Sequence, residues 1–165
     1  MMTKTGMVAL ASGALLAAAL PSAAGAQKIE RTGGNANSPI VGSISVPAAA
    51  NLLFLSGSVA SPIDPAKPDE LGDTKAQTLS ILTKMKAQLA EKGYTLGDVV
   101  KMTVFLVGTP ANGGRADTAG MNEVFRTFLG SADQPNKPTR STIQVAALGR
   151  PNILVEIEAI AAKLP

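Results

Sequence analysis

The sequence predicts one α+β domain whose strands and helices follow the order ββαβαββ. Apolar residues recur at three- and four-residue spacing in two segments, and they alternate with polar residues or form β-branched runs in the others. The strand candidates are 40–46, 51–57, 99–107, 140–148 and 152–161, and the helix candidates are 74–92 and the segment from Asp117 to Gly130. Two helices cover only one face of a mixed sheet, so the other face is expected to be bare.

The first helix has the clearest pattern in the chain. Its predicted apolar stripe consists of Ala76, Leu79, Leu82, Met85 and Leu89. Asp73 or Thr74 can cap the first turn, and Gly93 lies where a residue that ends a helix is expected. In the second helix, Asp117 can act as the cap and Gly130 follows the last turn.

The last strand candidate has two unlike faces, because side chains alternate along a strand. One face is apolar, whereas the other carries Glu156 and Glu158 between Leu154 and Ile160. A face that mixes carboxylates with large apolar side chains suits a subunit interface better than open solvent. We therefore expect an oligomer.

Residues 1–26 have the pattern of a secretory signal. Lys4 precedes an uncharged run rich in Ala and Leu, and Ala24-Gly25-Ala26 resembles a cleavage site. The apolar run of about 14 residues is shorter than the roughly 20 that span a bilayer. The sequence thus predicts Sec-type export to the periplasm or the medium, with no stable membrane insertion after cleavage. Residues 27–37 are expected to be a flexible lead-in, and 38–165 a single domain.

The composition removes several classes of chemistry. The chain has no histidine and no cysteine, which excludes Ser-His-Asp and Cys-His catalysis and sites built from thiolate or imidazole ligands. Its 15 basic and 12 acidic residues give a net charge of +3 without a basic run. A nucleic-acid surface normally shows clustered basic residues with aromatics among them. We therefore expect neither a nucleic-acid partner nor a cofactor.

Arg140 is the sharpest candidate for a binding residue. It follows Pro138-Thr139 at the start of a strand, and a guanidinium placed there offers a fork for a carboxylate. Judged from the residues alone, a surface ion pair is the commoner use of such an arginine. Glu156 can relay protons or orient water, or it can pair with a basic residue of a neighbour.

The spacing of the last two strands limits how these two residues can meet. If the strands formed a simple hairpin, Arg140 would lie roughly 13 Å from Glu156 at about 3.3 Å per residue. A direct contact therefore requires another strand pairing or a second subunit. Three further sites each have two interpretations. Ser56-Gly57 can supply a hydroxyl and a backbone that a ligand approaches closely, or it can simply end a strand, and Asn122 can face inward as a polar contact or outward on the helix surface. Lys101 is interpreted as an outward-facing lysine, because nothing in the sequence supports a Schiff-base role.

Six motifs together resemble the Rid family, also called YjgF or reactive-intermediate deaminases. They are LFLSG (53–57), AQTLSIL (76–82), GYTLGDVVKMTVFL (93–106), MNEVFRTF (121–128), KPTRSTIQVAALG (137–149) and VEIEAIA (155–161). The resemblance runs from about residue 38 to 162. It implies a chorismate-mutase-like fold, a homotrimer with clefts between subunits, and hydrolysis of 2-imino acids to 2-keto acids and ammonia.

The resemblance also implies roles for individual residues. Arg140 corresponds to the arginine that binds the substrate carboxylate, and Glu156 to the glutamate that helps to position or activate water. Ser56 and Asn122 correspond to further site residues. Thr142 occupies a position where members often carry cysteine. Ile40 stands where many active members have a tyrosine that lines the pocket, so this chain departs from the family pattern there.

Two other functions stay open at this point. The cleft can hold a small carboxylate without turnover, a reading that the missing tyrosine and the expected export both favour. Ribonuclease activity is attached to the family by name, but the absence of histidine and the modest charge weigh against it. The requirements of imine hydrolysis are met without histidine, cysteine or metal, because the imine carbon is already electrophilic and needs only a clamp, an oriented water and a proton relay.

Overall fold

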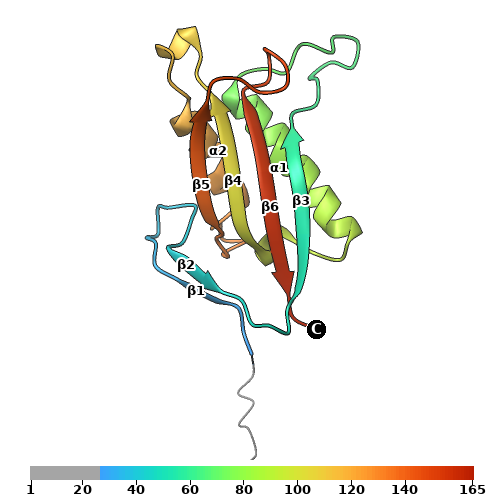
Figure 1. The fold of residues 1–165 in the computed structure, drawn as a ribbon, viewed down its shortest axis with the longest axis vertical. Coiled ribbons are helices and arrows are strands. Elements are labelled where there is room, and N and C mark those ends of the chain that lie inside the picture. Colours follow the sequence, from blue (N-terminus) through green and yellow to red (C-terminus); the bar gives the residue numbers. More distant parts are fainter. Residues whose placement is uncertain (1–26) are drawn as a thin grey trace, which may run out of the picture.

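A computed structural model describes residues 27–165, so the signal sequence expected at 1–26 lies outside the described residues. Figure 1 shows a four-stranded sheet beside a separate two-stranded ribbon. The elements are β1 (Glu30–Thr32), β2 (Ser43–Ser45), β3 (Asn51–Val59), α1 (Thr74–Glu91), β4 (Val99–Val107), α2 (Thr118–Phe128), β5 (Thr139–Val145) and β6 (Val155–Lys163), with short 3-10 turns at Leu96–Asp98 and Pro110–Asn112. Within this part of the chain, no helix is both long and apolar enough to cross a membrane.

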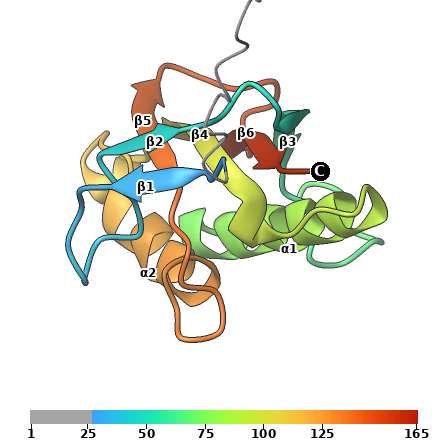
Figure 2. The same cartoon turned by 90° about the horizontal axis from the view of Figure 1, so that it is seen from below.

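The sheet has the strand order β3-β6-β4-β5. β6 runs antiparallel to both of its neighbours, whereas β4 and β5 are parallel. A parallel pair needs a crossover, which α2 supplies. Both helices pack on the same face of the sheet (Figure 2). The expected α+β class, with two helices on one face of a mixed sheet, is confirmed.

The core lies between the sheet and the helices. α1 begins where expected, because the Asp73 carboxylate accepts a hydrogen bond from the backbone N–H of Ala76 at 2.9 Å. Its buried face differs from the predicted stripe, since Leu79 is 50% exposed. The buried residues of α1 are Thr74, Gln77, Thr78, Ile81, Leu82, Met85 and Leu89. Polar residues complete this face because their hydrogen bonds are satisfied inside the core.

Gln77 connects α1 to the segment before β6. Its fully buried side chain donates to the carbonyl oxygens of Gly72 (3.0 Å) and Asn152 (2.9 Å). Its amide oxygen accepts a hydrogen bond from the N–H of Leu154 at 2.8 Å. These bonds fix the start of β6 against the helix and therefore the position of Glu156, two residues further on.

The N-terminal ribbon was not expected. β1 lies within the lead-in at 27–37, which was predicted to have no fixed structure, and the strand predicted over 40–46 is reduced to β2. Strands of three residues are too short to show alternation, so their sequence gives little signal. The guanidinium of Arg31 holds the ribbon to the domain by donating to the carbonyl oxygens of Gly97 (2.9 Å) and Val99 (3.4 Å).

The last two strands do not form a hairpin. β5 pairs with β4 only, and β6 lies between β3 and β4. β5 ends at Val145, earlier than the expected 148, and β6 begins at Val155. The connecting residues 146–154 thus cross from an edge strand to an inner one, and the hairpin distance between Arg140 and Glu156 does not apply.

We predict that Gln77→Leu destabilises the domain strongly. Leucine has a similar volume but leaves two carbonyls and one N–H without their partner, at a cost of about 1–3 kcal/mol for each group that stays buried. Urea denaturation of residues 27–165 measures the free energy of unfolding. Gln88→Leu, at an exposed position of the same helix, is the matched control and should change it little. Equal stability of the two variants would contradict the connecting role of Gln77.

Candidate functional site

Arg140 lies beneath α2, on the face of the sheet that the helices cover. Its backbone is in register with Met102, a fully buried residue of β4. One terminal nitrogen, Nη2, donates to the side-chain oxygen of Asn122 at 2.7 Å. The guanidinium carbon lies 4.5 Å from the centre of the Phe125 ring, a distance at which a cation is attracted to the ring face. Asn122 therefore faces inward, as one of its two readings proposed.

The guanidinium of Arg140 has no acidic partner among residues 27–165. Its Nε and Nη1 atoms are buried and make no hydrogen bond. Burial, together with the positive charge of Arg126, lowers the pKa of Arg140 to about 10, so the side chain is still charged at neutral pH. The surface ion pair considered for this residue is absent. Buried donors without partners mark a place where an anion can bind.

Thr142 and Ile40 lie on the same side of the molecule as Arg140. Thr142 is two residues along β5, so its side chain shares the face of Arg140. Ile40 is half-buried, and the next residue, Val41, donates its N–H to the carbonyl oxygen of Pro138 at 3.0 Å. This bond places the loop of Ile40 beside the start of β5. Tyr94, the only tyrosine of the chain, does not replace the pocket tyrosine, because its hydroxyl donates to the carbonyl oxygen of Asn51.

Glu156 lies at another place, against a glycine of β3. The pairing of β3 with β6 slips between Leu55 and Ser58, as in a β-bulge. At this irregularity the Glu156 carboxylate lies directly over Gly57, where any Cβ would overlap it. Gly57 thus provides the close approach that the sequence suggested, and the exposed Ser56 is its neighbour.

The sheet separates the two groups of candidate residues. Glu156 is in register with Phe105 on the bare face, whereas Arg140 is on the helix-covered face. Ser56 is on β3, at the opposite edge from β5, which is about 14 Å across three strand spacings. The structure therefore brings together Arg140, Asn122, Thr142 and Ile40. On the other face Glu156 lies over Gly57, whereas Ser56 lines a hollow with Lys101 and Glu158.

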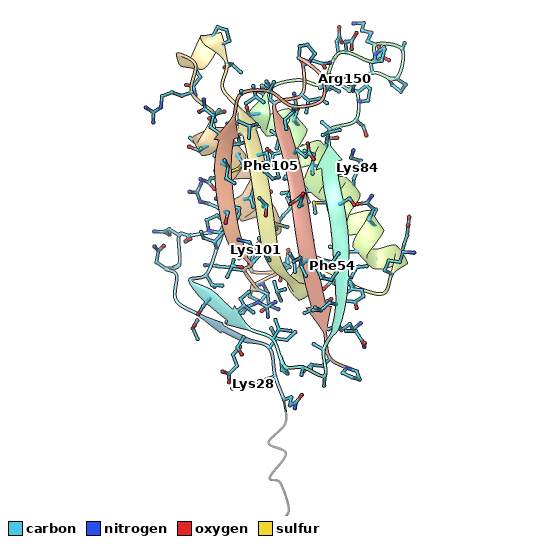
Figure 3. All side chains as sticks on the ribbon, viewed as in Figure 1. Lys28, Phe54, Lys84, Lys101, Phe105 and Arg150 are labelled. Carbon is cyan, nitrogen blue, oxygen red and sulfur yellow. The ribbon has the colours of Figure 1, made fainter. Side chains whose placement is uncertain are left out.

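The bare face carries large exposed apolar side chains among polar ones. Phe54 is 68% exposed and Leu52 51%. Figure 3 shows Phe54, Lys101 and Phe105 on this face. Lys101 faces outward, as expected, and donates to the Ser141 hydroxyl at 2.8 Å. Within the described residues, no group of three or more acidic side chains is placed to hold a metal ion.

Two contributors to the Arg140 site were not identified from the sequence. Phe125 and Arg126 occur only within the motif MNEVFRTF (121–128), and neither was given a role in the site. Both follow Asn122 at helical spacing, at i+3 and i+4, so they lie on its side of the helix. That spacing is the signal that connects them once Asn122 is taken as a site residue.

Comparison with known proteins identifies the family. The family model described as Endoribonuclease L-PSP matches residues 37–163. The chain belongs to this family, also known as YjgF or Rid. A RutC family protein of Pyrococcus horikoshii is 42% identical to this Rid-family chain over 117 residues, which cover 70% of the chain and 82% of the relative. TdcF of Escherichia coli K12, provisionally named a reactive intermediate deaminase, is 36% identical over 113 residues, or 68% and 80% of the two chains.

Solved structures of Rid proteins share the fold. A crystal structure of E. coli TdcF with bound serine matches with a TM-score of 0.54 and 30% identity, and covers 81% of this chain and 99% of that one. RidA from an Antarctic Psychrobacter matches with a TM-score of 0.55 and 29% identity over 81% and 100% of the chains. YyfB from Yersinia pestis matches with a TM-score of 0.59 and 25% identity, and the match covers 76% of this chain and 87% of that one.

We predict that Arg140→Met leaves the melting temperature unchanged or raises it. The folded-state pKa is below the usual value of an arginine, so the charged form opposes folding at neutral pH, and this cost declines only as the pH rises above about 10. Methionine fills the space without a charge. Thermal unfolding measures the effect. Arg31→Met is the contrasting control, because it removes two hydrogen bonds to carbonyl oxygens and should lower the melting temperature. An equal loss in both variants would contradict this account.

Proposed function

We propose that this Rid-family protein hydrolyses 2-imino acids to 2-keto acids and ammonia, in clefts between the protomers of a homotrimer. The observation that carries the proposal is the charged, half-buried Arg140, which has two unpartnered donor nitrogens and no acid beside it. The provisional name of TdcF supports the reaction class. The serine bound in the TdcF crystal supports a ligand with the carboxylate of an amino acid.

Arg140 is the carboxylate clamp. A guanidinium binds a carboxylate through two parallel hydrogen bonds, which fix the plane of the ligand as well as its position. Nε and Nη1 are shielded from solvent in the isolated protomer, so the side chain turns toward the cleft when it binds. Asn122, which holds Nη2, and the Phe125 ring guide that movement. Ile40 provides an apolar wall beside the clamp.

Glu156 positions the water. Its carboxylate takes a proton as the water oxygen bonds to the imine carbon and passes it to the nitrogen, which gives a carbinolamine. It then takes the hydroxyl proton as the carbonyl forms and passes that proton to the nitrogen, which leaves as ammonia when the carbon–nitrogen bond breaks. The products are a 2-keto acid and ammonia, and no electron transfer is involved. Ser56 precedes Gly57 on β3 and supplies a hydroxyl to the water or the leaving nitrogen.

A second protomer completes the site. Arg140 and Glu156 occupy opposite faces of the sheet, so the clamp of one protomer works with the carboxylate of another. The exposed apolar side chains of the bare face, among them Phe54 and Leu52, are suited to burial between protomers. Closed cyclic symmetry repeats this contact, and a trimer contains three equivalent sites.

We further propose that residues 1–26 are removed on export, which leaves an exported enzyme. N-terminal sequencing of the protein from the periplasm or the medium checks this, and the new N-terminus should lie near Gln27. Protein that stays in the cytoplasm with Met1 would contradict it.

A non-catalytic carboxylate-binding protein of the same fold is the second candidate. Ile40 favours it, because this apolar side chain stands where the family often places a tyrosine hydroxyl. The two candidates share Arg140 and differ in Glu156. Only the enzyme needs that carboxylate for turnover.

We predict that Glu156→Gln lowers the rate of keto-acid formation by on the order of 100-fold or more, since a general acid–base contributes 10²–10⁴-fold. Arg140→Ala should lose activity together with carboxylate affinity. An amino-acid oxidase generates the imino acid, and keto-acid release is measured. Glu70→Gln, at an exposed position in the loop before α1, is the control and should keep its activity. Binding without any turnover in the wild-type protein would favour the second candidate.

We also predict that the two inactive variants restore activity to each other when mixed. When equal amounts of the Arg140→Ala and Glu156→Gln chains assemble at random, about a quarter of all sites combine an intact arginine with an intact glutamate from the neighbour. Denaturation and joint refolding of the variants, followed by the rate assay, measures the recovery. A mixture as inactive as the separate variants would show that both residues act within one protomer.

A further inference from the structure

Arg126 stands beside the carboxylate clamp and has no role in the proposed reaction. It follows Asn122 by one turn of α2, which corresponds to about 5–6 Å between Cβ atoms. It is exposed, and its Nε donates to the carbonyl oxygen of Asn37 at 3.3 Å. Arg126 also lines a hollow between the C-terminal end of α2 and the loop of Asn37 and Ser38. That loop leads directly to Ile40.

Two positive charges therefore lie close together without an acid between them. Neither Arg126 nor Arg140 takes part in an ion pair within residues 27–165. The two charges interact, because the charge of Arg126 adds to the effect of burial in lowering the pKa of Arg140. Like charges in a partly buried place repel each other. A single carboxylate neutralises one of them, and only a ligand with two negative charges neutralises both.

We propose that the site accepts a short dicarboxylic 2-imino acid. Arg140 holds the carboxylate next to the imine carbon, and Arg126 binds the second carboxylate at the end of the ligand side chain. Arg140 bonds to Asn122, which lies one helical turn from Arg126, and a ligand with two or three carbons between its carboxylates spans a gap of that order. This inference rests on the proposed function, because Arg140 anchors the first carboxylate in both. Arg126 is thus a specificity residue, and the reaction yields a dicarboxylic 2-keto acid and ammonia.

Calorimetry with two matched keto acids tests the proposal. 2-Oxoglutarate and 2-oxopentanoate have the same chain length, and the second has a methyl group in place of the terminal carboxylate. The wild-type protein should bind 2-oxoglutarate at least about tenfold more tightly, since a hydrogen bond to a charged group contributes that much or more. Arg126→Gln should lose the preference and keep its affinity for 2-oxopentanoate, and Arg126→Lys should keep part of the preference.

Arg150→Gln controls for net charge. This exposed residue lies at the far end of the molecule (Figure 3), where β5 ends, whereas Arg140 is near the start of β5. The Arg150→Gln variant should prefer 2-oxoglutarate over 2-oxopentanoate as strongly as the wild-type protein does. Equal binding of both probes by the wild-type protein overturns the role of Arg126 and leaves the clamp intact. The role of Arg126 is also overturned if Arg126→Gln weakens the binding of both keto acids equally, or if that variant keeps the preference for 2-oxoglutarate.

The failure of the proposed function has a different signature. If the wild-type protein binds neither probe, the clamp at Arg140 is wrong, and the dicarboxylate inference falls with it. If dicarboxylate binding depends on Arg126 but no imino acid is turned over, the specificity inference stands, and the hydrolysis step of the proposed function is rejected.

Discussion

A positive charge held half-buried without an acidic partner is the constraint around which this molecule is arranged. Such a charge is unfavourable in a folded protein unless the surrounding packing holds it in place. The parallel pairing of β4 with β5 provides that packing. It requires α2 to cross over the sheet, and the crossover puts Asn122 and Phe125 against the guanidinium of Arg140. The core residues of α2 thus stabilise an arrangement that the site residues alone would not maintain.

The alternation of side chains along a strand decides what a single protomer can do. Residues of β5 and β6 that lie on opposite faces cannot meet through a sheet whose inner strands are tightly packed. Arg140 and Glu156 are separated in this way. Each protomer therefore carries two half-sites rather than one site, and the proposed assembly joins half-sites of different chains. The bare face and the chemistry are then coupled, because the same contact that buries Phe54 completes the cleft.

The sequence was informative where a physical pattern extends over several turns or pleats. Asp73 and Gly93 mark the ends of α1, and β-branched residues mark β4 over its full length. Leu79 was assigned to the wrong face because Gln77 and Thr78 are buried through hydrogen bonds that hydrophobicity does not reveal. The position of β6 between β3 and β4 is set by pairings between distant residues, and a local pattern carries no information about these. The family motifs identified Arg140 and Asn122, but only coordinates show that no acid approaches the guanidinium.

The proposed hydrolysis of an imine needs only a few functional groups. The reacting carbon is already electrophilic, so the protein has to supply position, one proton relay and shelter from bulk water. In the proposed reaction Arg140 supplies position, because no carboxylate among residues 27–165 neutralises its charge. Glu156 is the proposed proton relay, and it has room because Gly57 lacks a side chain. Excluding bulk water requires a surface on the other side of the ligand, and in the proposed trimer a second copy of the chain provides it. In the proposed site, selectivity then depends on what surrounds the clamp, and Arg126 is the charged neighbour proposed to distinguish ligands by their far end.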